Sequence, residues 1–225
     1  MKALAASLIA LLLPLSATAS IARAVAFDDK VDDAASIVLG KCVRQTAKWD
    51  ADRRWILTRS TFRVEKAMKG QPQGEVTVIT PGGSVDGIHQ DTIGMPSFRE
   101  GSDNVLFIRN TASGPTVLYF EQGAYDVVRD EKGNRIVRPV ASDAVHVDTQ
   151  RGMAVGPEAP RPLPQFESEV ASAIRRNAAQ RMEIVKPLPK KTNSASLGEI
   201  LHRNRLLVML AAFGLFLSAG QLFRR

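Results

Sequence analysis

The sequence predicts a mainly β fold, a small antiparallel barrel of the OB-like kind or a sandwich, followed by an amphipathic helix and one C-terminal transmembrane helix. Short apolar or alternating segments separated by turn residues fill the region from 36 to 139. A helical pattern follows, and a long uncharged run ends the sequence. We expect a signal peptide at 1–26, an exported β domain at 27–155, a Pro-rich linker with the helix at 156–196 and an anchor at 197–225.

The N-terminal segment has the order of features of a secretory signal peptide. Lys2 supplies a positive start, an apolar run follows over 3–13, and small residues then stand at cleavage-like spacing. This spacing allows signal peptidase cleavage at three positions, after Ala19, Ala24 or Ala26. The alternative is that the segment is not cleaved and acts as an N-terminal membrane anchor.

The expected strands are recognised by their alternation and by the turns between them. The segment 55–65 alternates, with Phe62 and Val64 on one face and Thr61 on the other, which is typical of a half-buried strand. The segment 104–109, NVLFIR, is a continuous apolar run and predicts a strand buried on both faces. We therefore expect a core containing Phe62, Val64, Leu106 and Ile108. The other expected strands are 36–48, 76–80, 116–121 and a hairpin over 125–139.

The region after residue 156 leaves the sheet, because GPEAPRPLPQ contains four prolines. Apolar residues then recur every four positions, which predicts an amphipathic helix of about 18 residues. Two placements are open: the helix docks on the β domain, or it stands between that domain and the membrane. The residues of the predicted apolar face are Phe166, Val170, Ile174, Ala178 and Met182.

The C-terminal run Leu206–Phe223 carries no charge and ends in Arg224 and Arg225. Its 18 residues would form a helix of about 27 Å, close to the hydrocarbon thickness of ~30 Å. We expect it to contact the lipid bilayer as a single span of the bacterial inner membrane, with the body on the periplasmic or extracellular side. A buried soluble helix and a processed sorting tail are the alternatives, although no Pro-Glu-Pro or Gly-Gly element precedes the run.

The net charge of +7 is unevenly distributed along the sequence. Residues 27–165 contain 18 Lys and Arg against 19 Asp and Glu, so the predicted domain is almost neutral. Its composition therefore gives no reason to expect a nucleic-acid partner. The basic excess lies at 166–225, where it either contacts anionic lipid head groups or forms ordinary solvated flanks of the span.

The residues that could carry chemistry are few. Cys42 is the only cysteine, which excludes an internal disulfide, and intermolecular pairing is the alternative to simple packing. The histidines show no paired spacing with other ligand residues, and no G-x-S-x-G motif occurs. We expect no cofactor and no metal, and an enzyme is the less favoured class.

The most informative segment is 81–103, PGGSVDGIHQDTIGMPSFREGSD. Because loops above ~12–15 residues are uncommon and tend to be functional, we expect its middle to contact a partner. Ile88 would supply an apolar contact, and Asp86, His89 and Asp91 polar ones. The alternatives are a hydrolase or metal-dependent enzyme that uses this loop, and a loop that only connects two strands.

One resemblance covers residues 36–109. The segments IVLGKCV, TRSTFRVEKAMKG, TPGG and GMPSFREG resemble a diffuse group of uncharacterised exported bacterial envelope proteins. Those proteins share a strand ending in Lys-Gly, a Pro-Gly-Gly and a G-x-P-x-F-x-x-G before an apolar strand. The first strands also resemble the OB-like barrels of tissue-inhibitor and netrin-type domains, which carry disulfides that this sequence lacks. The first resemblance implies no known activity, and the second implies at most a fold. The two ends of the sequence and the segment 81–103 instead lead us to expect a membrane-anchored module with a binding or structural role and an envelope protein or polymer as partner.

Overall fold

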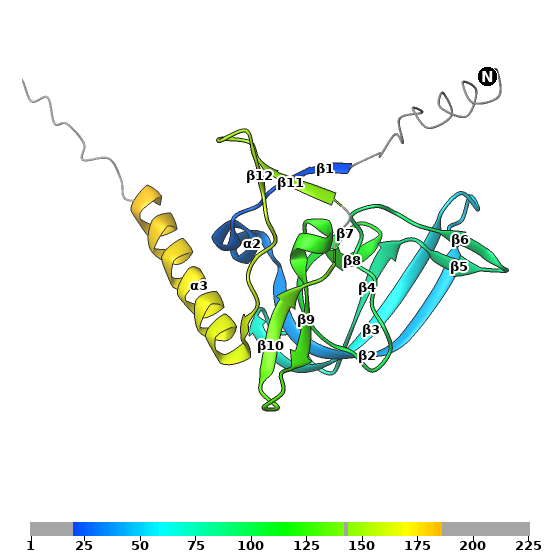
Figure 1. Ribbon diagram of the computed structural model, residues 1–225, viewed down its shortest axis with the longest axis horizontal. Coiled ribbons are helices and arrows are strands. Elements are labelled where there is room, and N and C mark those ends of the chain that lie inside the picture. The colour runs from blue at the N-terminus through cyan, green and yellow to red at the C-terminus, as the bar shows by residue number, and fades with distance from the viewer. Residues whose placement is uncertain (1–19, 142–143, 186–225) are drawn as a thin grey trace, which may run out of the picture. The chain divides into compact units, whose positions relative to one another are not determined.

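The computed structural model describes residues 20–141 and 144–185, and these are mainly β, as the sequence predicts (Figure 1). Most strands belong to one eight-stranded antiparallel sheet, in the order β13-β10-β9-β7-β2-β3-β4, with β8 paired to β7. The expected strands all appear, apart from part of 116–121. The strands of this sheet are β2 (Ser36–Trp49), β3 (Ile56–Lys69), β4 (Glu75–Pro81), β7 (Asp103–Thr111), β8 (Gly114–Val117), β9 (Ala124–Arg129), β10 (Arg135–Pro139) and β13 (Arg161–Pro162).

The sheet does not close, so the prediction of a closed barrel is wrong for the described residues. Strand β8 approaches β4, where Thr116 Oγ1 donates to the carbonyl of Ile79 at 2.8 Å. No ladder of backbone hydrogen bonds joins these two strands within the described part of the chain. The predicted strand 116–121 ends early, because Tyr119 and Phe120 both have positive φ and lead into the 3-10 turn η1 (Phe120–Gly123).

The two longest strands, β2 and β3, bend together (Figure 1). Their pairing is shifted at three places along β2, and such bulges bend a strand and increase its twist. Gly40 lies at one of these shifts, and a Cβ atom there would stand 2.8 Å from the carbonyl oxygen of Arg63. The glycine therefore permits the close approach of the two backbones at the bend.

The curved sheet has a hydrophobic cluster on each face. Alternate residues of β7 enter different clusters: Val105 and Phe107 lie on one face, and Leu106 and Ile108 on the other. All four are at most 1 % exposed, which confirms that this strand is buried on both sides. The predicted core is also confirmed, because Phe62, Leu106 and Ile108 are buried in one cluster and Val64 packs against it.

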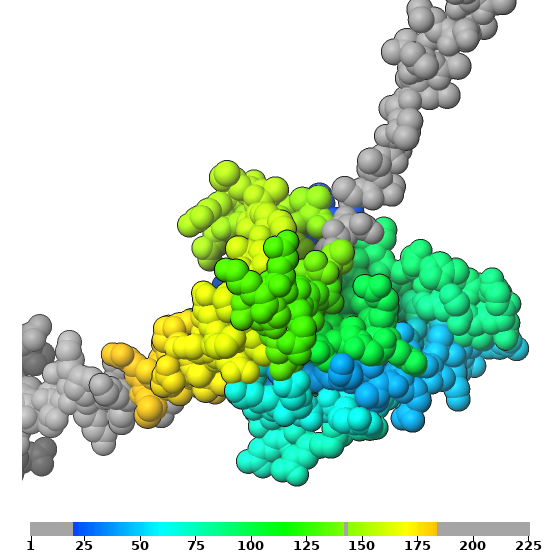
Figure 2. Space-filling model, turned by 60° about the horizontal axis from the view of Figure 1, so that its bottom comes forward, coloured from blue at the N-terminus to red at the C-terminus, as the bar shows by residue number. Residues whose placement is uncertain are grey.

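Two helices cover one face of the sheet. The short helix α2 (Phe27–Asp33) was not predicted, whereas α3 (Leu163–Val185) is the expected amphipathic helix. The aromatic ring of Phe166 lies edge-on to those of Phe27 and Tyr125, with centroids 5.5 and 5.0 Å away. Figure 2 shows α3, in yellow, directly against the body. The helix thus docks on the β domain, which decides between the two placements left open by the sequence.

A separate three-stranded sheet has the order β1-β11-β12. Strand β1 (Ser20–Arg23) runs parallel to β11 (Ala144–Asp148), and β11 is antiparallel to β12 (Met153–Val155). The first strand thus pairs with residues more than 120 positions later in the chain. A small hairpin, described below, forms the third sheet.

The described part of the chain contains no helix that is long and apolar enough to cross a membrane. The predicted span Leu206–Phe223 lies outside the described residues, as does most of the predicted signal peptide. By its contacts the chain divides after Met182, and the second unit contributes only 183–185, the end of α3, to the described residues.

Candidate functional site

The predicted contact loop contains a β-hairpin, which corrects the expectation that 81–103 lacks regular structure. Strands β5 (Gly83–Val85) and β6 (Ile88–Gln90) are antiparallel and joined by Asp86 and Gly87. These two residues have φ values of 52° and 76°, and positive φ at both central positions defines the two-residue turn that matches the twist of a hairpin. Asp-Gly is one of the favoured sequences for that turn.

The hairpin separates the four predicted site residues. Ile88 pairs with Val85 and is 53 % exposed, whereas His89 pairs with Ser84 on the opposite face. The structure brings His89 and Asp91 together, with 2.8 Å between His89 Nε2 and Asp91 Oδ1. Asp86 lies at the turn, and no hydrogen bond or ion pair of the described residues joins it to His89 or Asp91.

A chain of hydrogen bonds runs along the polar face of this hairpin. Ser84 Oγ lies 2.8 Å from Nδ1 of His89, whose other ring nitrogen faces Asp91. These three residue types are those of a serine nucleophile, its base and an orienting carboxylate. The side chains of His89 and Asp91 are 62 % and 85 % exposed, so water surrounds the group.

The hairpin is fastened to the tip of its larger neighbour, β2–β3. The backbone N–H of Ile56 donates to Gln90 Oε1 at 2.6 Å, and the N–H of Gly82 donates to the Ile56 carbonyl at 2.8 Å. Thr58 Oγ1 also donates to the carbonyl of Gly82 at 2.6 Å. The segment is therefore held at its base, while its turn projects.

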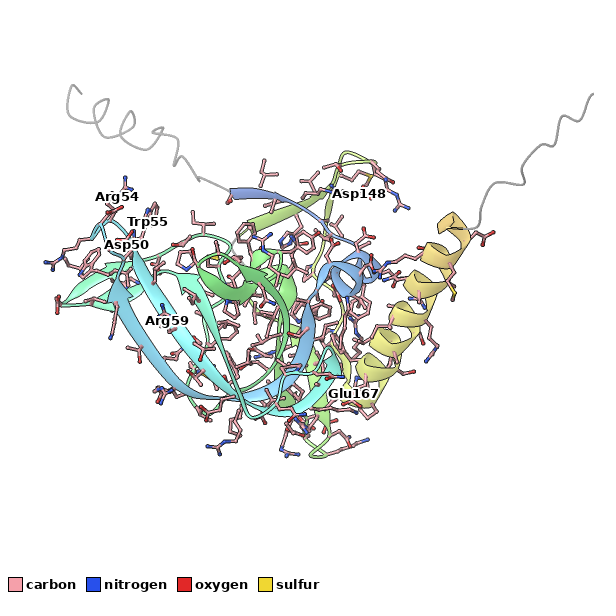
Figure 3. All side chains as sticks on the ribbon, turned by 180° about the vertical axis from the view of Figure 1, so that it is seen from behind. Asp50, Arg54, Trp55, Arg59, Asp148 and Glu167 are labelled. Atoms are coloured by element: carbon pink, nitrogen blue, oxygen red, sulfur yellow. The ribbon has the colours of Figure 1, made fainter. Side chains whose placement is uncertain are left out.

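The neighbouring turn of β2–β3 is ordered by one carboxylate. Asp50 Oδ1 accepts from the backbone N–H groups of Arg54 and Trp55, at 2.7 and 3.1 Å. Figure 3 labels all three residues at the free end of this hairpin. Trp55 is nonetheless 50 % exposed. The stretch between the two strands, WDADRRW, reads in the sequence only as a polar turn, and nothing in it marks the tryptophan as a contact residue.

We name the turn 50–55 and the segment 83–93 together the hairpin pair. Both parts lie at the end of the β domain remote from α3 (Figure 1). Between the hairpin and the main sheet is a cavity of about 200 Å³ with a mixed lining, which includes the polar Thr58 and Gln90 and the apolar Met95 and Phe98. This volume is below the ~300–1,000 Å³ typical of sites for drug-sized ligands. The hairpin pair therefore resembles a contact surface more than an enclosed site.

A second candidate region, missed by the sequence analysis, contains a buried lysine. Lys30 is 2 % exposed, and its ammonium donates to Tyr125 Oη at 2.6 Å, to the Gln122 carbonyl at 3.2 Å and to Glu158. Glu158 also accepts from Tyr125 and Arg161. We name Lys30, Tyr125 and Glu158 the lysine cluster.

The lysine cluster has perturbed titration. Burial lowers the pKa of the Lys30 ammonium, an effect that the charge of Glu158 only partly offsets. Burial, with a contribution from Glu158, raises the pKa of Tyr125 well above its usual value. For Glu158, burial favours the neutral acid, but Lys30, Arg161 and the tyrosine hydroxyl outweigh it and lower its pKa.

The same cluster lines a cleft of about 670 Å³, a volume within the range of ligand sites. The three donor positions of the Lys30 ammonium are all occupied by protein acceptors. The lysine cluster joins three elements: Lys30 comes from α2, Tyr125 from β9 and Glu158 from the segment before β13. No sequence pattern indicates it, because its members are far apart in the chain.

The remaining candidates give no sign of catalysis. Cys42 is fully buried in β2, and burial raises the pKa of its thiol, which disfavours the reactive thiolate. Residues 20–141 and 144–185 hold no cluster of three His, Cys, Asp or Glu side chains placed to bind a metal ion. No family model matches the chain, and no curated protein matches it.

Proposed function

We propose that the chain is an exported binding module of the bacterial cell envelope, tethered to the inner membrane by Leu206–Phe223. The signal-like N-terminus supports translocation of the body, and the uncharged C-terminal run supports a single span. The partner is an envelope protein or polymer. The nearly neutral β domain gives no support for nucleic acid as that partner.

The observation that carries the proposed contact surface is the exposure of apolar side chains on fastened turns. Trp55 and Ile88 are each at least half exposed, and both stand in the hairpin pair, whose base is hydrogen-bonded to the sheet. Tryptophan is enriched among the residues that contribute most to protein interfaces. A held turn also loses less conformational entropy on binding than a free loop does.

The polar neighbours complete this surface. Asp86 stands at the turn beside Ile88, and His89 with Asp91 borders the apolar contact from the opposite face of the hairpin, so groups that form hydrogen bonds lie next to it. An apolar centre with a polar rim is the usual arrangement of a protein interface. The resemblance to uncharacterised exported proteins, which covers 36–109, includes both parts of the hairpin pair, and it remains part of this proposal.

Site-specific photo-cross-linking in the source bacterium tests the surface. A benzophenone amino acid at position 55 or 88 should give one discrete adduct, and the same residue at 132, in the exposed β9–β10 turn, should give none. Adding Ile88→Asp to the chain labelled at position 55 should abolish the adduct. Equal adducts at 55 and 132, or an adduct insensitive to Ile88→Asp, would exclude the hairpin pair as the contact surface.

The contacts of the segment 83–93 determine which substitutions can test its role without disturbing the fold. Replacing all of 84–93 by a Gly-Ser linker removes Gln90, whose side chain accepts from the Ile56 backbone. Substituting only the exposed residues keeps this attachment. We therefore expect Asp86→Asn, which tolerates the positive φ of the turn, His89→Ala and Asp91→Ala together to weaken cross-linking from position 55 while leaving the melting temperature nearly unchanged.

A hydrolase that uses this loop is the second candidate, favoured by the Ser84–His89–Asp91 chain. In the usual triad the histidine Nε2 takes the serine proton, whereas here Nδ1 faces Ser84. The group is also open to water, which weakens electrostatic stabilisation of a developing charge. Labelling by a fluorophosphonate probe, lost in Ser84→Ala and kept in the control Ser97→Ala, would favour the hydrolase; no labelling favours the binding module.

A further inference from the structure

Strand β1 is an integral part of the fold, although it lies within the region predicted to be the signal peptide. Its four residues pair in register with β11, from Ser20 opposite Ala144 to Arg23 opposite Val147. The backbone N–H of Ala24 continues this ladder and donates to the Val147 carbonyl at 2.9 Å.

The residues after β1 are fixed by further contacts. The side chain of Gln122 binds both sides of Ala24: its Nε2 donates to the Arg23 carbonyl, and its Oε1 accepts from the Val25 N–H, each at 3.0 Å. The carbonyl of Ala26 accepts the N–H of Lys30 at 3.0 Å, which closes the first turn of α2. Each residue from 20 to 26 is thus in, or directly beside, a backbone contact of the body.

These contacts discriminate among the three possible signal cleavage positions. A cut after Ala24 would remove β1, leaving one edge of β11 unpaired and the Gln122 amide nitrogen without the Arg23 carbonyl. A cut after Ala26 would also remove the carbonyl that Lys30 requires and place a positive α-ammonium at the N-terminus of α2, where the helix dipole disfavours it. A cut after Ala19 keeps every one of these contacts.

We propose that a membrane-bound signal peptidase hydrolyses the peptide bond between Ala19 and Ser20. Water adds across this bond, giving a carboxylate on Ala19 of the released peptide and an α-ammonium on Ser20 of the mature chain. Ala17 and Ala19 supply the small residues that such a peptidase requires before the cut. The inference rests on the proposed function, since it assumes that the N-terminal segment directs export.

The surroundings of Ser20 suit the new positive charge. Ser20 lines a cleft of about 650 Å³ whose wall also includes Asp29, Asp32 and Asp33 of α2. The neighbouring Tyr119 hydroxyl donates to Asp33, and this carboxylate, with Asp29, contributes to the raised pKa of the tyrosine. An α-ammonium at this position would share the cleft with these three carboxylates and with the guanidinium of Arg23, whereas an uncleaved chain has a neutral amide there.

The test is the N-terminus of the full-length chain after expression and purification from the membrane fraction of an export-competent bacterium. Intact mass and N-terminal sequencing should give one species, beginning Ser-Ile-Ala-Arg. A chain that begins at Val25 or Phe27 would overturn the proposed position while leaving export intact. A chain that retains Met1 would overturn both the position and the cleaved export signal.

Two substitutions sharpen the result. Ala19→Arg places a large charged residue directly before the cut, so the precursor should accumulate or be cut elsewhere. Ala26→Arg lies at an exposed position and spoils only the site after residue 26, so the mature chain should still begin at Ser20. An N-terminus that moves with Ala26→Arg and not with Ala19→Arg would contradict the proposal.

Discussion

Phe62 lies on β3 in the same hydrophobic cluster as Leu106 and Ile108, where its ring meets that of Phe98 edge-on at 5.0 Å. Truncating a buried phenylalanine to alanine typically costs ~3–5 kcal/mol. For a domain of this size each kcal/mol lowers the melting temperature by about 2–4 °C. We expect Phe62→Ala to show a shift of this order by circular dichroism, and Arg63→Ala, at an exposed position, to show almost none.

Thr61 shows what alternation in the sequence leaves undetermined. The pattern placed Phe62 and Val64 inside correctly, and by itself it suggested that Thr61, on the opposite face, faces water. In the structure Thr61 is 4 % exposed and its hydroxyl is 2.9 Å from that of Thr77. The period of a strand indicates which residues share a face, but what covers the second face depends on the rest of the fold.

Glu158 provides a pH-dependent prediction at the same scale. Its pKa is lowered in the folded protein, so the unfolded chain binds more protons below the ordinary glutamate value of about 4.3. Its stabilising contribution is therefore complete above that pH and is lost as the pH falls through the folded pKa. We expect Glu158→Gln to lower the melting temperature at pH 7, and the difference from the wild type to shrink at pH 3–4.

The size of this effect depends on burial. Removing one member of a fully buried ion pair costs ~3–5 kcal/mol, which is an upper limit here because the Glu158 side chain is 31 % exposed. Glu167→Gln is the matched control. Glu167, labelled in Figure 3, pairs with a half-exposed Lys66, and such surface pairs contribute only ~0–1 kcal/mol. Equal losses of stability from both substitutions would show that the ion pair of the lysine cluster stabilises the fold no more than a surface pair does.

At the scale of elements, the two ends of helix α3 differ in how far their apolar side chains are buried. Phe166 is fully buried between α2 and the sheet, whereas Met182, four turns later, is 71 % exposed. We expect Phe166→Ala to cost ~3–5 kcal/mol in the free energy of unfolding, measured by chemical denaturation. Met182→Ala should change it by less than ~0.5 kcal/mol. A comparable loss from Met182→Ala would mean that the helix end is covered in solution.

The sequence located this helix correctly, but its apolar face only in part. Residues four apart are turned by about 40° from one another on a helix of 3.6 residues per turn, so a strict four-residue series drifts around the surface. Of the predicted apolar face, Phe166 and Val170 are buried, whereas Met182 is exposed. Ala173, which was not part of the predicted face, is buried in the core. A mixed spacing of three and four follows the buried face instead.

The hairpin β5–β6 was, by contrast, predictable in part. Val-Asp-Gly-Ile within 81–103 contains an Asp-Gly turn between β-branched residues, which is a strong short-range hairpin signal. The many glycines and prolines around it favoured an irregular loop instead. Its attachment through Gln90 and Thr58 could not be predicted, because it depends on residues 34 and 24 positions away in the chain.

At the scale of the whole molecule, the topology can be tested with reporters. A reporter fused after Gln165 would interrupt helix α3, so we place the fusion after Ser194, which follows this helix in the sequence. A reporter that works only in an oxidising compartment should be active there, and one that works only in the cytoplasm should be active after Arg225. The reverse pattern would contradict the proposed orientation.

The global arrangement was the least predictable level. The strands and their order along the chain favoured a barrel, but β8 ends at Val117, just before the turn at Tyr119 and Phe120, and does not pair with β4. Two non-glycine residues with positive φ leave no trace in hydrophobic periodicity. The lysine cluster was hidden for a similar reason, since only the tertiary fold brings Lys30 to Glu158.

The pairing of β1 with β11 has a consequence for the order of events during synthesis. A contact between residues more than 120 positions apart cannot form until β11 has emerged, and such long-range closure is slow. The contact of Phe27 with Phe166 and that of Lys30 with Glu158 likewise cannot form until the later residue of each pair has emerged. In the proposed export, the start of the body therefore lacks these partners until nearly all of it has been translocated. The proposed cut before Ser20 can then be made before β1 pairs with β11, and this pairing afterwards places the new N-terminus in the three-stranded sheet.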